Sequence, residues 1–112
     1  MEKTKILVIC SGYFNPLHKG HIEYLKRSKE AGTFLYVIVN NDLQRELKGS
    51  TPFLTEQQRR TILKNIKAVD DVIISIDKNK FVDKTIEAIQ NFKSGIVEYP
   101  LQKLSLPRLA LL

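Results

Sequence analysis

The chain of 112 residues contains one cysteine, Cys10, and no long apolar run. A single cysteine excludes an internal disulfide and favours a reducing compartment, so we expect a cytoplasmic protein. No segment approaches the roughly 18 apolar residues of a membrane-spanning helix, and residues 1–5 lack the apolar segment of a signal peptide. Internal repeats and low-complexity linkers are also missing. These absences favour one domain without a membrane partner.

Positive charge is in excess but never dense. The net charge is +6, and all of the excess falls in residues 1–67. The chain has no dense basic run and no basic strand interleaved with aromatic residues, as RNA-recognition modules have. We therefore expect an anionic small molecule to bind the first part of the chain, and no nucleic acid. The nucleic-acid alternative would require an affinity that falls steeply with salt.

Apolar runs alternate with amphipathic segments along most of the chain. Three runs are almost entirely apolar, which is typical of strands buried on both faces of a parallel sheet; they are residues 5–10, 34–39 and 72–76, in which only Lys5 and Ser75 are polar. Helical spacing follows each run, at about residues 18–30, 55–67 and 82–89. This alternation predicts an α/β fold with a Rossmann-like, doubly wound and mostly parallel sheet.

Local signals predict where these elements begin, end and face. Thr55 and Gln58 are spaced as a helix-capping box, and Gly32 is expected to end the first helix as a C-terminal glycine. Residues 40–53 are expected to form a polar loop. The inward faces of the first two helices are expected to carry Ile22, Tyr24, Leu25, Ile62, Leu63 and Ile66.

The pattern loses its clarity towards the end of the chain. We expect residues 1–91 to form the α/β domain and residues 92–112 to be an atypical leucine-rich segment of the same domain. Within that segment, Ile96 to Tyr99 would make a short fourth strand that Pro100 stops. The sheet is thus expected to be truncated after its third or fourth strand.

The only two histidines, His18 and His21, lie between the first strand and the first helix. Side chains three residues apart share a helix face. Unpaired backbone N–H groups and the positive end of the helix dipole point to the same place. The layout predicts an anion site that is suited to phosphates.

This stretch resembles a known family. His18-Lys19-Gly20-His21 is similar to the HxGH signature of nucleotidyltransferases, and residues 12–16 resemble the glycine–aromatic loop that precedes it. The whole stretch looks like the cytidylyltransferase branch. The resemblance implies transfer of a nucleotidyl group from CTP or ATP to a phosphorylated small molecule, with release of pyrophosphate. It also implies Mg²⁺ carried mainly by the nucleotide phosphates, and a homodimer.

The resemblance also implies roles for individual residues. It assigns catalysis to His18, His21 and Lys48, and nucleotide binding to Gly12, Tyr13, Phe14, Asn15, Gly20 and Arg59, with no protein ligand to a metal. The acceptor phosphate is already ionised near pH 7, so positioning and charge stabilisation would carry the reaction. A turn-forming role for Asn15 and an ordinary loop position for Lys48 are the alternatives.

The likeness covers about residues 4–89. Family members continue with a Gly-Asp turn and an R-x-x-x-I-S-[ST] motif, and neither is found after Asn91. That motif would hold the triphosphate from the side opposite the histidines. Without it, the phosphates would be held less accurately, and misplacement slows a reaction. The expectation is therefore a nucleotidyltransferase, with cytidylyl transfer favoured; adenylyl transfer and nucleotide binding without catalysis are the alternatives.

Overall fold

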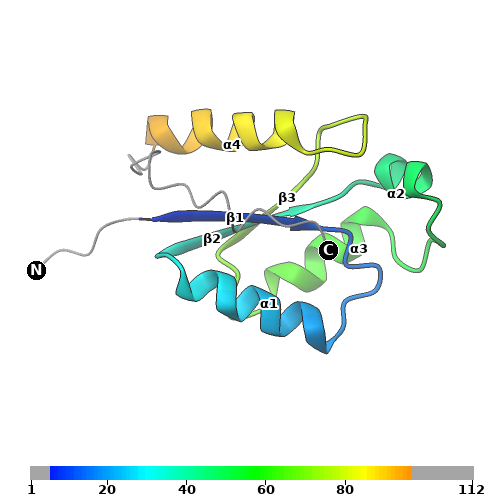
Figure 1. Ribbon diagram of the computed structural model, residues 1–112, viewed down its shortest axis with the longest axis horizontal. Helices are drawn as coiled ribbons and strands as arrows, with labels where there is room; N and C mark the ends of the chain where they lie inside the picture. Colours follow the sequence, from blue (N-terminus) through cyan, green and yellow to red (C-terminus); the bar gives the residue numbers. More distant parts are fainter. Residues whose placement is uncertain (1–5, 97–112) are drawn as a thin grey trace, which may run out of the picture.

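The computed structural model describes residues 6–96, with side chains described as far as Asn91. The described part contains three parallel strands and four helices (Figure 1). In chain order they are β1 (Leu7–Gly12), α1 (Lys19–Glu30), β2 (Phe34–Val39), α2 (Asp42–Lys48), α3 (Glu56–Lys64), β3 (Asp71–Ile74) and α4 (Asp83–Ile96). The strand order is β1-β2-β3. Because both strand pairs are parallel, the carboxyl ends of all three strands lie at the same end of the sheet.

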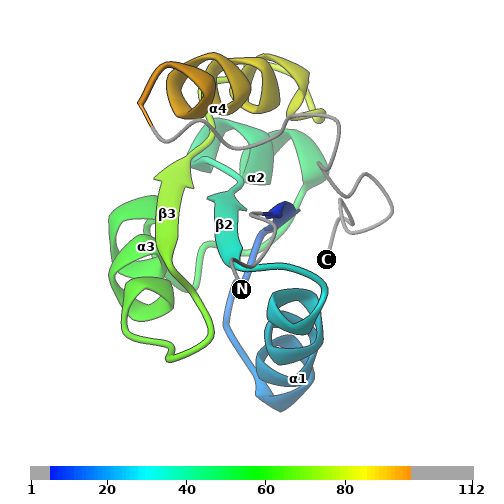
Figure 2. The ribbon, with the colours of Figure 1, turned by 90° about the vertical axis from the view of Figure 1, so that its left-hand side faces the viewer.

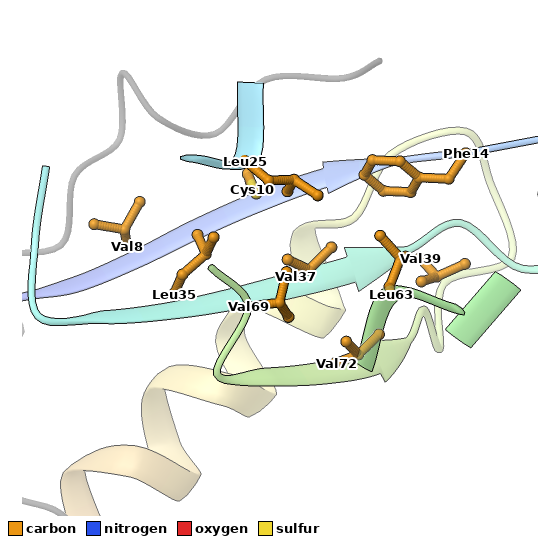
Figure 3. Packing of buried hydrophobic residues seen from close by; sticks show 10 residues of the cluster. All are labelled: Val8, Cys10, Phe14, Leu25, Leu35, Val37, Val39, Leu63, Val69 and Val72. Atoms are coloured by element: carbon orange, nitrogen blue, oxygen red, sulfur yellow. The ribbon is translucent and has the colours of Figure 1, made fainter. Parts of the chain in front are cut away.

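Helices cover both faces of the sheet, because alternate residues of each strand point to opposite sides. Val8 and Cys10 pack with Leu25 of α1 and Leu63 of α3 on one face (Figure 3). Leu7 and Ile9 belong to the cluster on the other face. That cluster also contains Val82, just before α4, and Ile89 of α4. Figure 2 shows the resulting layers, with α4 on one side of the sheet and α1 and α3 on the other.

The helix boundaries confirm one local prediction and correct two. The Thr55–Gln58 capping box is formed at the start of α3. Gly32 does not act as a left-handed cap, because α1 ends with the right-handed residue Ala31. A side chain at Gly32 would lie 2.6 Å from Val8 Cγ2, so close packing requires this glycine. The expectation of an irregular loop over residues 40–53 is wrong, because α2 occupies half of it.

The inward-facing residues are partly as expected. Leu25 and Leu63 are fully buried, whereas Ile22 and Ile62 are 39% and 40% exposed. Tyr24 and Ile66 are half-buried against the core. The buried apolar stripe on α1 and on α3 is therefore narrower than the spacing of apolar residues in the sequence suggested.

The end of the described chain is helical. α4 continues to Ile96, where a fourth strand was expected to begin; the rest of that strand and the leucines after it lie outside the described residues. None of the described helices is both long enough and apolar enough to span a membrane.

Candidate active site

The candidate site lies where β1 and β2 end. The backbone N–H of Asn40, just after β2, donates to the carbonyl of Gly12 at 2.9 Å. The chain then turns from Gly12 through Tyr13 and Phe14 towards α1. Phe14 has a φ of 50° and a fully buried ring in the core (Figure 3). This buried ring anchors the loop that carries the histidines.

His18 and His21 form a reciprocal cap at the start of α1. The backbone N–H of Gly20 donates to His18 Nδ1, and the backbone N–H of His18 donates to His21 Nδ1, both at 3.0 Å. The two rings stack with centroids 3.8 Å apart and an interplanar angle of 26°. Because each Nδ1 accepts a hydrogen bond, each neutral ring carries its hydrogen on Nε2. In that form, the two stacked rings offer two Nε2–H donors beside a helix N-terminus.

The surroundings of His21 favour this neutral form. Burial and the neighbouring His18 lower the pKa of His21 below its usual value. The edge of the ring also meets the buried Phe14, with centroids 5.1 Å apart. A neutral imidazole keeps Nδ1 free to accept, so the lowered pKa and the cap support each other.

Gly20 is required by the position of the His18 ring. A Cβ at Gly20 would lie 2.9 Å from His18 Cε1 and 3.2 Å from its Nδ1. The family resemblance assigned Gly20 to nucleotide binding. In the structure, the first group that a side chain here would meet is the histidine itself.

Lys48 ends α2 on the side of the loop after β1. Its Nζ lies 4.3 Å from the centroid of the Tyr13 ring, in the geometry of a cation–π contact. The ring of Tyr13 is largely buried, and burial raises the pKa of its hydroxyl, although Arg59 opposes the shift. The structure thus brings Lys48 to the same loop as the histidines.

Asn15 joins the histidine loop to the segment before α3. Its Nδ2 donates to the carbonyl of Thr51 at 2.7 Å, and its Oδ1 accepts from the backbone N–H of Leu54 at 3.1 Å. Both ends of the amide are therefore engaged by backbone. This geometry supports a positioning role for Asn15.

The side chain of Arg59, which was predicted to bind the nucleotide, has no exposed surface. Its guanidinium donates to the carbonyls of Tyr13, Asn40 and Leu54 at 2.8, 2.6 and 3.3 Å. It also forms a 2.8 Å ion pair with Asp42. The guanidinium is thus buried and makes four hydrogen bonds to protein groups. Arg59 instead holds together the ends of β1 and β2 and the loop before α3.

The sequence analysis did not predict a network of side-chain amides at the start of α2. Asn41 caps α2 reciprocally with Gln44, and its Nδ2 donates to the carbonyls of Ser75 and Asp77, both at 2.9 Å. Gln44 donates to the carbonyl of Phe81 at 2.8 Å. The spacing Asn41–Gln44 followed by Gly49 is the signature of a capped helix and could have revealed α2.

The described residues offer no cluster of three or more His, Cys, Asp or Glu side chains that could hold a metal. Asp42, the first residue of α2, pairs with Arg59, and its side chain is 40% exposed.

Comparison with known proteins identifies the family. A sequence model of the cytidylyltransferase-like family matches residues 9–97, which include the histidine loop and all four helices. The chain belongs to this family. It is therefore a member of the nucleotidyltransferase superfamily, as the HxGH resemblance predicted.

Individual relatives agree with this assignment. FAD synthase of Thermococcus sibiricus is 38% identical over 112 residues, a match that covers 91% of this chain and 76% of the relative. FAD synthase of Pyrococcus horikoshii is 42% identical over 94 residues, covering 83% of this chain and 61% of the relative. Bifunctional protein HldE of Syntrophotalea carbinolica is 38% identical over 98 residues, only 19% of its length. The chain thus corresponds to a part of these longer relatives.

A solved structure confirms the fold. The crystal structure of the lipopolysaccharide core biosynthesis protein from Thermoplasma volcanium shares 35% identity with the chain and superposes with a TM-score of 0.67. The match covers 73% of this chain and 66% of that one. The predicted Rossmann-like α/β fold is therefore confirmed.

Proposed function

We propose that this chain transfers a nucleotidyl group from a nucleoside triphosphate to a phosphorylated small molecule and releases pyrophosphate. The observation that carries the proposal is the stacked pair of His18 and His21, whose Nδ1 atoms are held by backbone N–H groups. Their Nε2–H groups are then donors at a helix N-terminus, where phosphate oxygens bind well. The family assignment supports the same chemistry.

In this proposal, an oxygen of the acceptor phosphate attacks the α-phosphorus and the bond to the bridging oxygen of pyrophosphate breaks. Negative charge on the α-phosphate oxygens is stabilised by the two imidazole N–H donors, by Lys48 and by backbone N–H groups of residues 12–14. Gly20 leaves room for the His18 ring. Asn15 and Arg59 keep the loop in place without touching the substrate.

ATP is the first candidate for the nucleotide. FAD consists of an adenylyl group joined to flavin mononucleotide (FMN), so relatives named FAD synthase favour adenylyl transfer to an alkyl phosphate such as that of FMN. Cytidylyl transfer is the second candidate, because Lys48 lies where cytidylyltransferases of this type place a phosphate-binding lysine. The cytoplasm and a homodimer remain predictions from the sequence.

Pyrophosphate release by the full chain tests the proposal. MgATP or MgCTP would be supplied with FMN or glycerol 3-phosphate, and we expect turnover with one pair. His21→Ala should lower kcat/KM about a hundredfold or more, as expected when one donor to a developing charge is removed. Lys26→Ala, an exposed change on α1, is the matched control and should retain activity.

The outcomes separate the alternatives. Nucleotide binding by calorimetry without pyrophosphate release would favour a relative that binds but does not catalyse. Folded protein that binds neither ATP nor CTP would contradict the proposal altogether.

A further inference from the structure

The candidate active site accounts for little of the positive charge in the chain. The net charge is +6, and the sequence led us to expect that the excess in residues 1–67 serves an anionic small molecule. Of the two cations assigned to the site, Arg59 has a buried side chain and Lys48 lies over the Tyr13 ring. Most of the positive charge of this part of the chain therefore lies elsewhere.

Part of this charge borders a groove on the α1 side of the sheet. The groove lies between the exposed face of α1 and residues 66–68, which connect α3 to β3, and its volume is about 580 Å³. Figure 2 shows α1 and this connection on the same side of the sheet. The α1 wall carries Ile22, Lys26, Lys29 and Glu30, and the opposite wall carries Ile66, Lys67 and Ala68.

The floor of the groove is apolar and its backbone is held in place. Ile66 and Ala68 are half-buried, and Ile22 on the facing helix is 39% exposed. The N–H of Ile66 donates to the Leu63 carbonyl at 3.1 Å, and the N–H of Val69 donates to the Ile66 carbonyl at 3.0 Å. Apolar groups that are open to water favour a partner that covers them, and a rigid surface loses little entropy on binding.

An ion pair fixes the distance between the two walls at one end of the groove. Lys29 of α1 pairs with Asp70, which follows the connection. The Asp70 carboxylate also accepts from the backbone N–H of Leu35 at 2.7 Å, and Lys29 Nζ donates to the Thr33 carbonyl at 3.2 Å. The groove is therefore already formed in the free chain.

The rim of the groove is positively charged. Lys26 and Lys67 are exposed, and neither forms an ion pair with any residue that the structure describes. Glu30 is the one acidic residue of the lining, against three lysines. An apolar floor thus lies between an unpaired cation on α1 and another on the facing wall.

This combination suits a helix that is apolar on one face and acidic beside that face. Apolar side chains three and four residues apart would cover the floor, as in helix-in-groove complexes, and flanking carboxylates would pair with Lys26 and Lys67. A nucleic acid would find no aromatic side chain in the lining on which a base could stack. A membrane surface takes up the protruding apolar face of a helix, whereas Ile66 and Ala68 are half-buried between exposed lysines.

We propose that the groove between α1 and residues 66–68 is a docking site for an acidic amphipathic helix of another protein. The α1 wall runs from Ile22 to Glu30, about 12 Å at the helical rise per residue, so about two turns of the partner would lie in contact. Ile22 directly follows His21, so the partner would lie beside the helix that begins with the histidine cap. Docking needs neither nucleotide nor turnover and is independent of the proposed function.

Binding of a synthetic peptide to the full chain tests the inference. The probe is a fluorescein-labelled peptide of about 14 residues, with leucines at helical spacing on one face and glutamates beside them, and fluorescence anisotropy measures its affinity. Lys67→Glu should weaken binding about tenfold, because an attraction becomes a repulsion. Ile22→Ser should weaken it by a similar factor of about ten, because apolar contact is lost.

Matched variants distinguish the groove from the rest of the surface. Lys64→Glu changes the net charge by the same amount outside the lining, and Ile62→Ser removes an isoleucine that is 40% exposed on α3; both should bind the peptide like wild type. All four substituted residues are exposed, and circular dichroism checks that each variant is folded. A peptide with lysines in place of glutamates should bind Lys67→Glu more tightly than wild type.

Several results would overturn the inference. It fails if wild type does not bind the glutamate peptide, if the two control variants lose as much affinity as Lys67→Glu and Ile22→Ser, or if serines in place of the leucines leave binding unchanged. It also fails if a single-stranded oligonucleotide or phosphatidylglycerol vesicles bind through Lys67 and the peptide does not. The proposed function is judged separately, by pyrophosphate release, and its failure would leave these results unchanged.

Discussion

Among single residues, Gly20 decides where the His18 ring lies. In Gly20→Ala, the new Cβ would stand 2.9 Å from His18 Cε1, so the ring must leave its place against Gly20 N–H and His21. Loss of the cap costs about 1 kcal/mol, but alanine gains a similar amount of helix propensity over glycine. We therefore expect nearly unchanged stability and at least tenfold weaker MgATP binding, measured by urea unfolding and calorimetry.

Gly49→Ala is the opposite case and serves as the control. Gly49 has a φ of 83° and nothing within 4 Å of a Cβ. A non-glycine residue there costs about 1–2 kcal/mol in the backbone without touching the histidines. It should lower stability and leave nucleotide affinity unchanged. If both variants lost affinity equally, the specific role of Gly20 would be refuted.

His21 should make stability depend on pH. Its pKa in the folded chain is lowered below the usual 6.5 by burial and by His18. As pH falls below 6.5, the unfolded chain binds a proton that folded His21 does not, so falling pH favours unfolding. Urea unfolding should thus show lower stability at pH 5.5 than at pH 7.5. His21→Gln keeps a capping acceptor and should reduce this difference; an unchanged difference would exclude His21 as the cause.

At the scale of the elements, the side chain of Arg59 links α3 to the sheet. It belongs to α3 but bonds the ends of β1 and β2, through the carbonyls of Tyr13 and Asn40. The sequence predicted that Arg59 binds the nucleotide, and the structure shows its guanidinium bonded to these carbonyls and to Asp42. Spacing along a helix indicates that a residue lies on the inner side, but it does not indicate which groups its side chain contacts.

Removing Arg59 should therefore destabilise the fold. Arg59→Ala leaves three buried or half-buried carbonyls and Asp42 without their donor, and loss of such a charge-assisted network costs about 3 kcal/mol or more. Arg60→Ala, its half-buried neighbour, should cost much less. The free energy of unfolding in urea measures both. Equal losses would contradict a special role for the buried guanidinium.

For the whole molecule, the parallel sheet is what assembles the site. Because β1 and β2 run in the same direction, the loop after β1 and α2 after β2 meet at one edge, and His18, His21 and Lys48 come from these two segments. The apolar runs of the sequence predicted parallel strands between layers of helices, and the three-layer arrangement confirms this prediction.

The amino-acid sequence determined the α/β alternation, the family and the pairing of His18 with His21. Each of these depends on residues close together in the chain, and local spacing records such relations. Tertiary structure decided that Arg59 is buried, that Gly32 accommodates Val8, and that Asn15 binds Thr51 and Leu54. These depend on contacts between segments up to 46 positions apart, and packing at that range leaves no periodic trace in a sequence.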